Sequence, residues 1–135
     1  MKEEWTRWLP IEKMGGKYYV DEIKDNMIEF KVIFCNSVEE DKKVSIIFDK
    51  WVLAYRSTYE SIRQKTINSL YEKYGIDFFS ECTFFKVRNS EYIEWVSEQS
   101  YGVFDSEELI HFSFVAADSI VDIVASYEPI IEFSA

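Results

Sequence analysis

The sequence predicts an α+β protein, with an antiparallel or mixed sheet of five to seven strands and two main helices packed on one face. Two runs near opposite ends of the chain, Met27 to Asn36 and Leu109 to Ala116, alternate large apolar residues with other residues, as strands do. Between Thr58 and Tyr74, apolar residues recur at helical spacing instead. Strands followed by a mixture of helices and strands favour helices gathered on one face of a sheet.

The chain of 135 residues is long enough for one domain with a substantial core, and we expect residues 1–135 to form a single globular domain. Residues 1–16 form a possible N-terminal arm, helical or irregular. Trp5, Trp8 and Leu9 in this arm could clamp onto the sheet or meet a partner. Only 4 glycines and 2 prolines are present, so neither a linker nor a glycine-rich phosphate loop is expected.

Three strands are predicted before residue 50, after a turn at Gly15–Gly16. They cover Lys17 to Lys24, Met27 to Asn36 and Lys43 to Asp49. In the second, Ile28, Phe30, Val32 and Phe34 share one face, and Val44, Ile46 and Phe48 do so in the third. Lys50 to Arg56 either continues the third strand after a bulge or forms a further one.

Two helices are predicted from their capping residues. Ser57 and Glu60 match a capping box, which predicts a helix from Thr58 to Tyr74 that ends at Gly75. Asn89-Ser90 caps a second helix from Glu91 to Ser100, with Tyr92, Ile93 and Val96 facing inward. A strand from Phe84 to Arg88 lies between the two helices in the sequence.

The C-terminal run predicts an antiparallel hairpin around Asp118–Ser119, with a short edge strand at Ile130 to Phe133 folding back beside it. A single core is expected from twelve apolar residues of the strands and helices: Ile28, Phe30, Val32, Val44, Ile46, Phe48, Leu70, Ile93, Val96, Ile110, Phe112 and Phe114.

No motif in the sequence predicts catalysis, a metal site or a cofactor. His111 is the only histidine, and its place opposite the expected core face predicts a structural or surface role. Cys35 and Cys82 lie in apolar runs, which favours buried free thiols. Neighbouring acids such as Glu107 and Glu108 leave open a carboxylate-dependent enzyme, because the separation of carboxylates cannot be read from sequence.

Arg56 follows a strand directly before the first predicted helix. The guanidinium could pair with Glu60 or with a carboxylate of the sheet. The alternative is a recognition site at the junction of strand and helix.

The net charge is −10, from 25 acidic and 15 basic residues. A general nucleic-acid binder needs a positive surface, so the charge argues against nucleic acid and fits a basic protein partner. The N-terminus has no apolar signal-peptide core and no run is long enough to cross a membrane, so we expect a cytoplasmic protein without membrane contact. The oligomeric state cannot be read from the sequence.

Three stretches carry a resemblance: Tyr55–Arg63, Phe85 to Tyr92, and the residues His111, Asp118, Asp122 and Glu128-Pro129. From Tyr55 onward the chain resembles small acidic bacterial proteins that are found beside polymorphic toxins. Such immunity proteins bind a toxin domain in the producing cell and block it. The resemblance implies this function in general terms and assigns a role to no residue, because it includes no diagnostic motif.

The leading hypothesis is therefore a non-catalytic binding protein, an immunity protein that binds and neutralises a basic bacterial toxin domain. The alternative is a small-molecule-binding or regulatory α+β domain, and the third is the carboxylate-dependent enzyme. A partner is expected at the second predicted helix and its exit, where acids and aromatics gather. The residues of this partner-binding surface are Glu91, Glu94, Trp95, Glu98, Tyr101, Asp105, Glu107 and Glu108.

Overall fold

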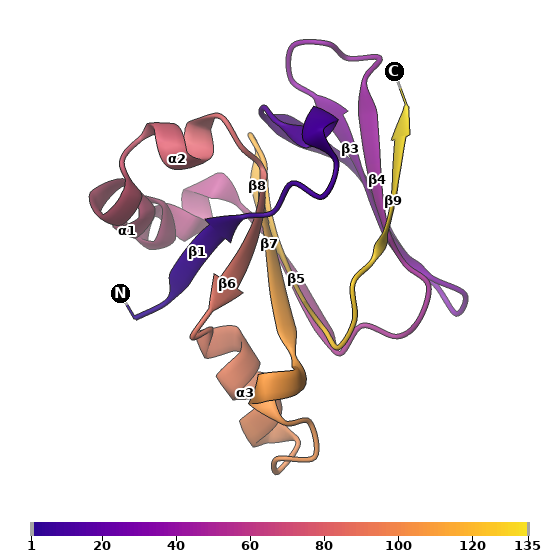
Figure 1. Ribbon diagram of the computed structural model, residues 1–135, viewed down its shortest axis with the longest axis vertical. Coiled ribbons are helices and arrows are strands. Elements are labelled where there is room, and N and C mark those ends of the chain that lie inside the picture. The colour runs from indigo at the N-terminus through magenta and orange to yellow at the C-terminus, as the bar shows by residue number, and fades with distance from the viewer. Residues whose placement is uncertain (1, 135) are drawn as a thin grey trace.

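The computed structural model describes residues 2–134 and confirms the α+β class with two main helices. Its strands form two antiparallel sheets rather than the one sheet expected. Figure 1 shows three layers: the helices, then the five-stranded sheet in the middle, then the four-stranded sheet on the far side. The strands outnumber the prediction because short pairing segments at residues 4–7 and 54–59 join the middle layer.

Sheet A, the middle layer, has the order β1-β6-β7-β8-β5 and sheet B has the order β2-β3-β4-β9. The strands of sheet A are β1 (Glu4–Arg7), β6 (Phe84–Arg88), β7 (Ile110–Val115), β8 (Ser119–Ala125) and β5 (Ala54–Tyr59). Those of sheet B are β2 (Tyr18–Asp25), β3 (Phe30–Asn36), β4 (Lys43–Phe48) and β9 (Ile130–Ser134).

The helices are α1 (Gln64–Tyr74), α2 (Asp77–Ser80) and α3 (Glu91–Gln99). The predicted capping box at the start of α1 is wrong, because Ser57 pairs with Val121 as part of β5 and a 3₁₀ turn over Glu60–Arg63 precedes the helix. Sheet pairing along β8 therefore overrides the local helix signal. The cap of α3 is confirmed: the Ser90 hydroxyl accepts the Ile93 amide hydrogen at 3.1 Å.

The core is divided over both faces of sheet A instead of forming one cluster. Phe112 and Phe114 of β7 meet Phe34 and Phe48 of sheet B between the two sheets. Other apolar residues of sheet A pack against α1 and α2, or against α3. Of the twelve predicted core residues, ten are buried, and Ile110 is half-buried against the core between the sheets.

The remaining one, Ile28, is 81% exposed, so its placement in the core is wrong. The alternation of β3 begins only at Phe30, and residues 26–29 form the turn from β2. Asn26 holds this turn, since its carboxamide oxygen accepts the amide hydrogens of Ile28 and Glu29.

Sheet A is covered on both faces, and this overturns the surface position considered for His111. The side chain is 1% exposed, because the face of β7 opposite the inter-sheet core lies beneath the helices. Alternation along a strand shows which residues share a face of the sheet. It does not show whether the second face is exposed to water or covered by other elements.

Three smaller expectations are also corrected. The N-terminal arm is not helical in the region of Trp5, because β1 pairs with β6 and joins sheet A. The edge strand β9 pairs with β4 in sheet B and not with the C-terminal hairpin of β7 and β8. Cys82 is buried as expected, but Cys35 is half-buried, because it lies on the face of β3 turned away from sheet A.

Within residues 2–134, no helix is long and apolar enough to cross a membrane.

Candidate functional site

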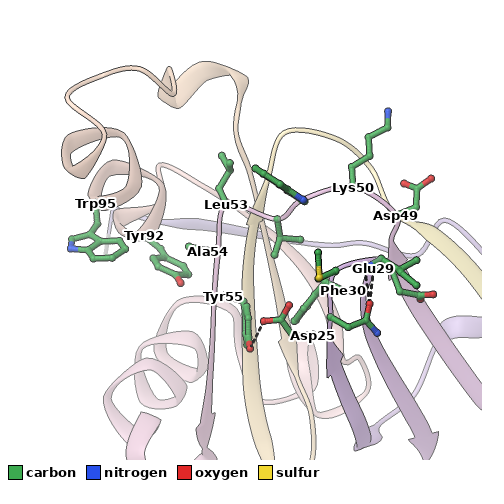
Figure 2. A pocket seen from close by; sticks show the side chains of 15 residues that line it. Asp25, Glu29, Phe30, Asp49, Lys50, Leu53, Ala54, Tyr55, Tyr92 and Trp95 are labelled. Carbon is green, nitrogen blue, oxygen red and sulfur yellow. Dashed lines mark hydrogen bonds between the residues drawn. The ribbon is translucent and has the colours of Figure 1, made fainter.

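A cleft lies between α3 and the turn from β2 to β3, and we name it the acidic–aromatic cleft. Figure 2 shows Tyr92 and Trp95 on the α3 side, Asp25 and Glu29 on the opposite side, and Tyr55 between them. Its volume is about 800 Å³. The lining residues are Asp25, Asn26, Met27, Ile28, Glu29, Phe30, Asp49, Lys50, Trp51, Val52, Leu53, Ala54, Tyr55, Tyr92 and Trp95.

Large apolar side chains at the edge of this cleft reach into solvent. Trp51 is 88% exposed, Trp95 is 53% exposed, and Met27 and Ile28 are exposed beside them. The cleft floor is fixed, because Tyr55 packs on Phe30 at 4.4 Å between ring centroids and donates to the Asp25 carboxylate at 3.1 Å. Burial and this bond to Asp25 raise the pKa of Tyr55. Exposed apolar groups on a fixed floor are typical of a surface that meets a partner.

Glu29 has a carboxylate oxygen that is incompletely paired. Its Oε2 atom is buried and makes no hydrogen bond to any atom of residues 2–134. A buried acceptor without a donor costs free energy. Because Glu29 also lines the acidic–aromatic cleft, this unpaired acceptor belongs to a residue of the cleft wall.

All eight residues of the predicted partner-binding surface are exposed, and they lie on α3 and the segment that follows it. The predicted inward face of α3 is confirmed, with Tyr92, Ile93 and Val96 buried. Trp95 lines two clefts, one on each side of the helix, and Glu91 lines one of them. Glu94, Glu98 and Tyr101 line a shallower hollow of about 410 Å³. Asp105 caps the exposed 3₁₀ segment that follows, and Glu107 and Glu108 lie on that segment.

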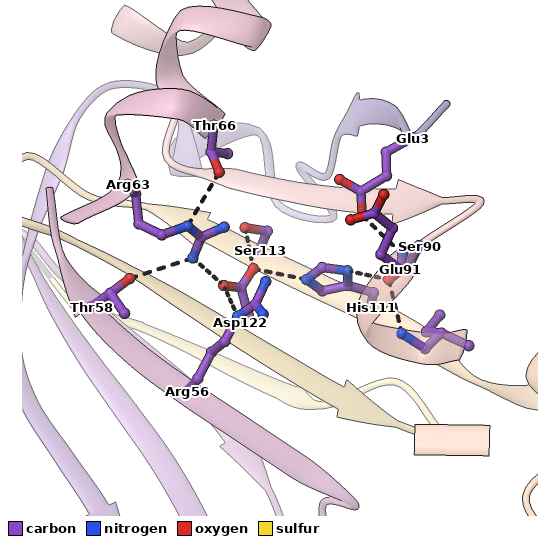
Figure 3. Close-up of polar contacts among 11 residues, drawn as sticks. Glu3, Arg56, Thr58, Arg63, Thr66, Ser90, Glu91, His111, Ser113 and Asp122 are labelled. Carbon is purple, nitrogen blue, oxygen red and sulfur yellow. Dashed lines mark hydrogen bonds and ion pairs between the residues drawn. The ribbon is translucent and has the colours of Figure 1, made fainter. Parts of the chain in front are cut away.

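A buried polar network lies between sheet A and the helices, with Asp122 of β8 at its centre (Figure 3). Asp122 is fully buried, and its carboxylate accepts four hydrogen bonds. His111 Nε2 at 2.8 Å and Ser113 Oγ at 2.7 Å donate to Oδ1. Arg56 Nε at 2.9 Å and Arg63 Nη1 at 2.7 Å donate to Oδ2. Arg56 therefore pairs with a carboxylate of the sheet, one of the two partners considered from the sequence, and not with Glu60.

The protonation of this network follows from its contacts. Burial by itself raises the pKa of Asp122, but the hydrogen bond from His111 and the charges of Arg63 and Arg56 outweigh burial and hold the pKa well below its usual range. Asp122 is thus a carboxylate, which can only accept, so His111 Nε2 carries a hydrogen. Ser90 Oγ accepts the Ile93 amide and lies 2.7 Å from His111 Nδ1, to which its own hydrogen can be donated.

Ser90, His111 and Asp122 form a chain of hydrogen bonds like the relays that activate serine nucleophiles. The nucleophile of such a relay must reach a substrate, but Ser90 is only 3% exposed and lines none of the clefts described here. Its hydroxyl is also held by the cap of α3. The arrangement therefore suits a structural role, in which β7, β8 and α3 are joined across the helix layer.

The two arginines are accessible on one side. They line a second cleft of about 600 Å³, which we name the arginine cleft. Arg56 covers the Tyr92 ring, with its guanidinium carbon 4.3 Å from the ring centroid. The residues of the arginine cleft are Glu3, Arg56, Arg63, Thr66, Glu91, Tyr92 and Trp95.

Sequence reasoning missed most of the acidic–aromatic cleft, including Trp51, Asp49 and the turn at Met27. These residues come from segments that meet only when sheet A packs on sheet B. Asp122 carried a signal that could have been used, because a single acid within the apolar run from Ile120 to Ala125 requires a buried cationic partner.

Comparisons with protein-family models, with curated proteins and with solved structures found no match to the chain.

Proposed function

We propose that this chain is a non-catalytic binding protein that neutralises a basic protein domain through the acidic–aromatic cleft and the outer side of α3. The observation that carries the proposal is the combination, around one cleft, of exposed Trp51 and Trp95 with the carboxylates of Asp25, Glu29 and Asp49. Large aromatic side chains supply most of the contact energy in protein interfaces, and carboxylates set orientation and association rate.

Charge complementarity identifies the chemistry of the partner. The chain carries a net charge of −10, and the cleft contributes three acids against Lys50. The unpaired Oε2 atom of Glu29 adds an acceptor that a lysine or arginine of the partner would satisfy. A basic surface, such as one that a toxin domain uses to hold an anionic substrate, fits these groups.

The packing of the molecule favours protein binding over the small-molecule domain as an account of this cleft. The space between the sheets is filled by aromatic rings, with Phe34, Phe84 and Phe114 in mutual contact. The acidic–aromatic cleft instead lies at the surface and has its largest apolar groups on the edge. Several exposed apolar groups gathered around one cleft are typical of a surface that a second protein covers.

The resemblance to immunity proteins suggests which kind of basic protein the partner is. We propose that the partner is a bacterial toxin domain encoded by the neighbouring gene, and that the complex forms in the cytoplasm of the producing cell. The acidic character of the chain and its aromatic surface are compatible with this role.

The test is co-expression of the toxin domain from the neighbouring gene with this chain, followed by co-purification. We expect the intact chain to restore growth and to co-purify with the toxin. Trp51→Ala should reduce both, since Trp51 is exposed and its loss leaves the core unchanged. Val38→Ala is the matched control, because Val38 is equally exposed but lies in the loop before β4, outside the acidic–aromatic cleft. Failure of the intact chain both to bind and to restore growth would rule out the toxin-neutralising function.

A further inference from the structure

We propose that the arginine cleft is a separate binding site for a zwitterion of amino-acid size, whose carboxylate is held by Arg56 and Arg63. The proposal does not depend on the toxin-neutralising function. It rests on the donors that Asp122 leaves unused, on the carboxylates across the cleft, and on the aromatic wall that both clefts share.

Asp122 uses only part of each guanidinium group. The Asp122 carboxylate accepts hydrogen bonds from Nε of Arg56 and Nη1 of Arg63, while Nε of Arg63 donates to the Thr66 hydroxyl at 3.2 Å. Three guanidinium nitrogens donate no hydrogen bond to residues 2–134. They are the two terminal nitrogens of Arg56 and Nη2 of Arg63. Two guanidinium groups fixed by one buried carboxylate therefore present free N–H donors to the cleft, and planar guanidinium forks match a carboxylate.

The arginines are held in place before any ligand arrives. Arg63 is largely buried, with 13% of its side chain exposed, and the guanidinium carbon of Arg56 lies over the Tyr92 ring at 4.3 Å from its centroid. Asp122 neutralises one of the two positive charges, so one positive charge remains for a ligand. Donors that are already fixed lose little conformational entropy on binding, which favours even a small ligand.

The other side of the cleft carries negative charge. Figure 3 shows Arg56 and Arg63 on one side of Asp122, and Glu3 and Glu91 on the other side, near Ser90 at the start of α3. The Glu3 carboxylate accepts the Glu91 amide hydrogen at 3.0 Å and is thereby fixed at this end. A phosphate, with more than one negative charge, would be repelled by these two acids. A ligand with one carboxylate and one ammonium group matches both sides.

The aromatic wall adds a preference for the body of the ligand. Tyr92 and Trp95 lie 6.0 Å apart between ring centroids, and Trp95 leaves half of its surface exposed. An aromatic amino acid could stack on Trp95 while its carboxylate meets the arginines. The volume of about 600 Å³ is within the range of small-ligand sites.

Phenylalanine, 3-phenylpropionate and 2-phenylethylamine form a matched set of probes, because they share one body and carry both charges, only the carboxylate or only the ammonium. Each is titrated into the ¹⁵N-labelled protein while the side-chain signals of Arg56, Arg63 and Trp95 are followed by NMR. We expect phenylalanine to shift these signals with a Kd of about 1 mM, and each singly charged probe to bind about tenfold more weakly.

Two variants and a control separate binding from folding. Arg56→Gln should weaken phenylalanine binding about tenfold, whereas Arg88→Gln, at an exposed arginine of the same sheet outside the cleft, should have no effect. Glu91→Gln should remove the preference for phenylalanine over 3-phenylpropionate and leave the backbone spectrum unchanged, because the Glu91 side chain is exposed. Equal shifts from all three probes, or no shifts up to about 10 mM phenylalanine, would contradict the proposal.

Discussion

At the scale of single residues, the group with the largest structural consequence is Asp122. Its carboxylate accepts from two residues of β7, from one residue of β5 and from one residue of the 3₁₀ turn before α1. A buried ion pair is a weak source of stability compared with apolar packing, but removal of one partner leaves the others buried and unpaired. Asp122 thus fixes how the helix layer sits on sheet A more than it contributes net stability.

Asp122→Asn should therefore lower the free energy of unfolding by about 3–5 kcal/mol, because two arginines and His111 lose their carboxylate. Asp41→Asn, at an exposed position in the loop before β4, is the matched control and should change stability by less than about 0.5 kcal/mol. Denaturant unfolding measures both. If Asp122→Asn lowered the unfolding free energy as little as Asp41→Asn, the hydrogen bonds to the Asp122 carboxylate would not have the structural role assigned to them.

The same carboxylate predicts how stability depends on acid. The pKa of Asp122 is lower in the folded protein than in the unfolded chain, so the unfolded chain takes up the proton first as the pH falls. Stability from this group is complete above the ordinary aspartate pKa of about 4 and declines below it. The decline between about pH 4 and pH 2 should be smaller in Asp122→Asn than in the unchanged protein, measured by denaturant unfolding. Parallel curves for the two proteins would contradict this assignment.

Lys17 predicts a second rise of stability with pH, this time in alkaline solution. Burial lowers its pKa to about 8 from 10.5, although Nζ donates to the carbonyl oxygens of Phe79 and Cys82. Between these pH values the unfolded chain holds a proton that the folded protein has lost, so the contribution of Lys17 to stability rises with pH.

The unfolding free energy of the unchanged protein minus that of Lys17→Met should therefore increase by about 1–2 kcal/mol between about pH 7 and about pH 9.5. Both proteins retain Tyr18, Tyr55, Tyr92 and Tyr127, whose pKa values burial raises, so the effect of these tyrosines cancels in the difference. A difference that stays constant with pH would show that Lys17 keeps its ordinary pKa.

At the scale of elements, strand alternation determines which side chains meet between the two sheets. Phe30 of β3 packs beside Phe48, and Phe112 of β7 packs against Phe48 from the other sheet. Phe30→Ala or Phe112→Ala should each cost about 3–5 kcal/mol in unfolding free energy, by loss of buried area and creation of a cavity. Ile28→Ala, two residues before Phe30 but exposed, should cost less than about 0.5 kcal/mol in the same assay. Similar costs at Phe30 and Ile28 would mean that the register of β3 is different.

Elements with one strong pattern were predictable from the sequence, and those set by distant partners were not. The alternation of β3 and β4, the hairpin of β7 and β8, and the cap of α3 all depend on neighbours in the chain. The segment from Ala54 to Tyr59 carries a helix-start signal but forms β5, because β8 offers a complete row of partners. The place of β9 in sheet B likewise depends on its pairing with β4, which no local pattern records.

For the candidate site, the sequence predicted the outward acids and Trp95 of α3 but not the opposite wall of the cleft. A helix periodicity determines which residues of α3 face away from the sheet. The opposite wall comes from the β2–β3 turn and from residues 49–53, whose position depends on how sheet B packs on sheet A. The partner of Arg56 could not be chosen from the sequence, because the choice depends on the register between β5 and β8, which places Arg56 opposite Asp122.

At the scale of the whole molecule, the three layers place two clefts of different charge on either side of Tyr92 and Trp95. The packing of sheet B against sheet A brings the β2–β3 turn close to α3 and forms the acidic–aromatic cleft. The packing of α1 and α3 on the other face of sheet A forms the arginine cleft above Asp122. One side of α3 thus suits a basic protein and the other side a small zwitterion.

The central claim, that a basic partner binds at the acidic–aromatic cleft and α3, is tested most directly by affinity for the toxin domain at two salt concentrations. One variant combines Glu94→Lys and Glu98→Lys with Trp95→Ala. The control, Glu39→Lys with Glu40→Lys, makes the same change in net charge in the loop before β4. Circular dichroism and denaturant unfolding establish that both variants remain folded.

We expect the unchanged protein and the loop control to bind tightly at about 50 mM salt and more weakly at about 500 mM, because salt screens the charges of a basic partner. The α3 variant should bind at least about 100-fold more weakly at low salt and lose most of this salt dependence. Equal affinity of the α3 variant and the loop control at both salt concentrations would contradict the claim and place the binding face elsewhere on the molecule.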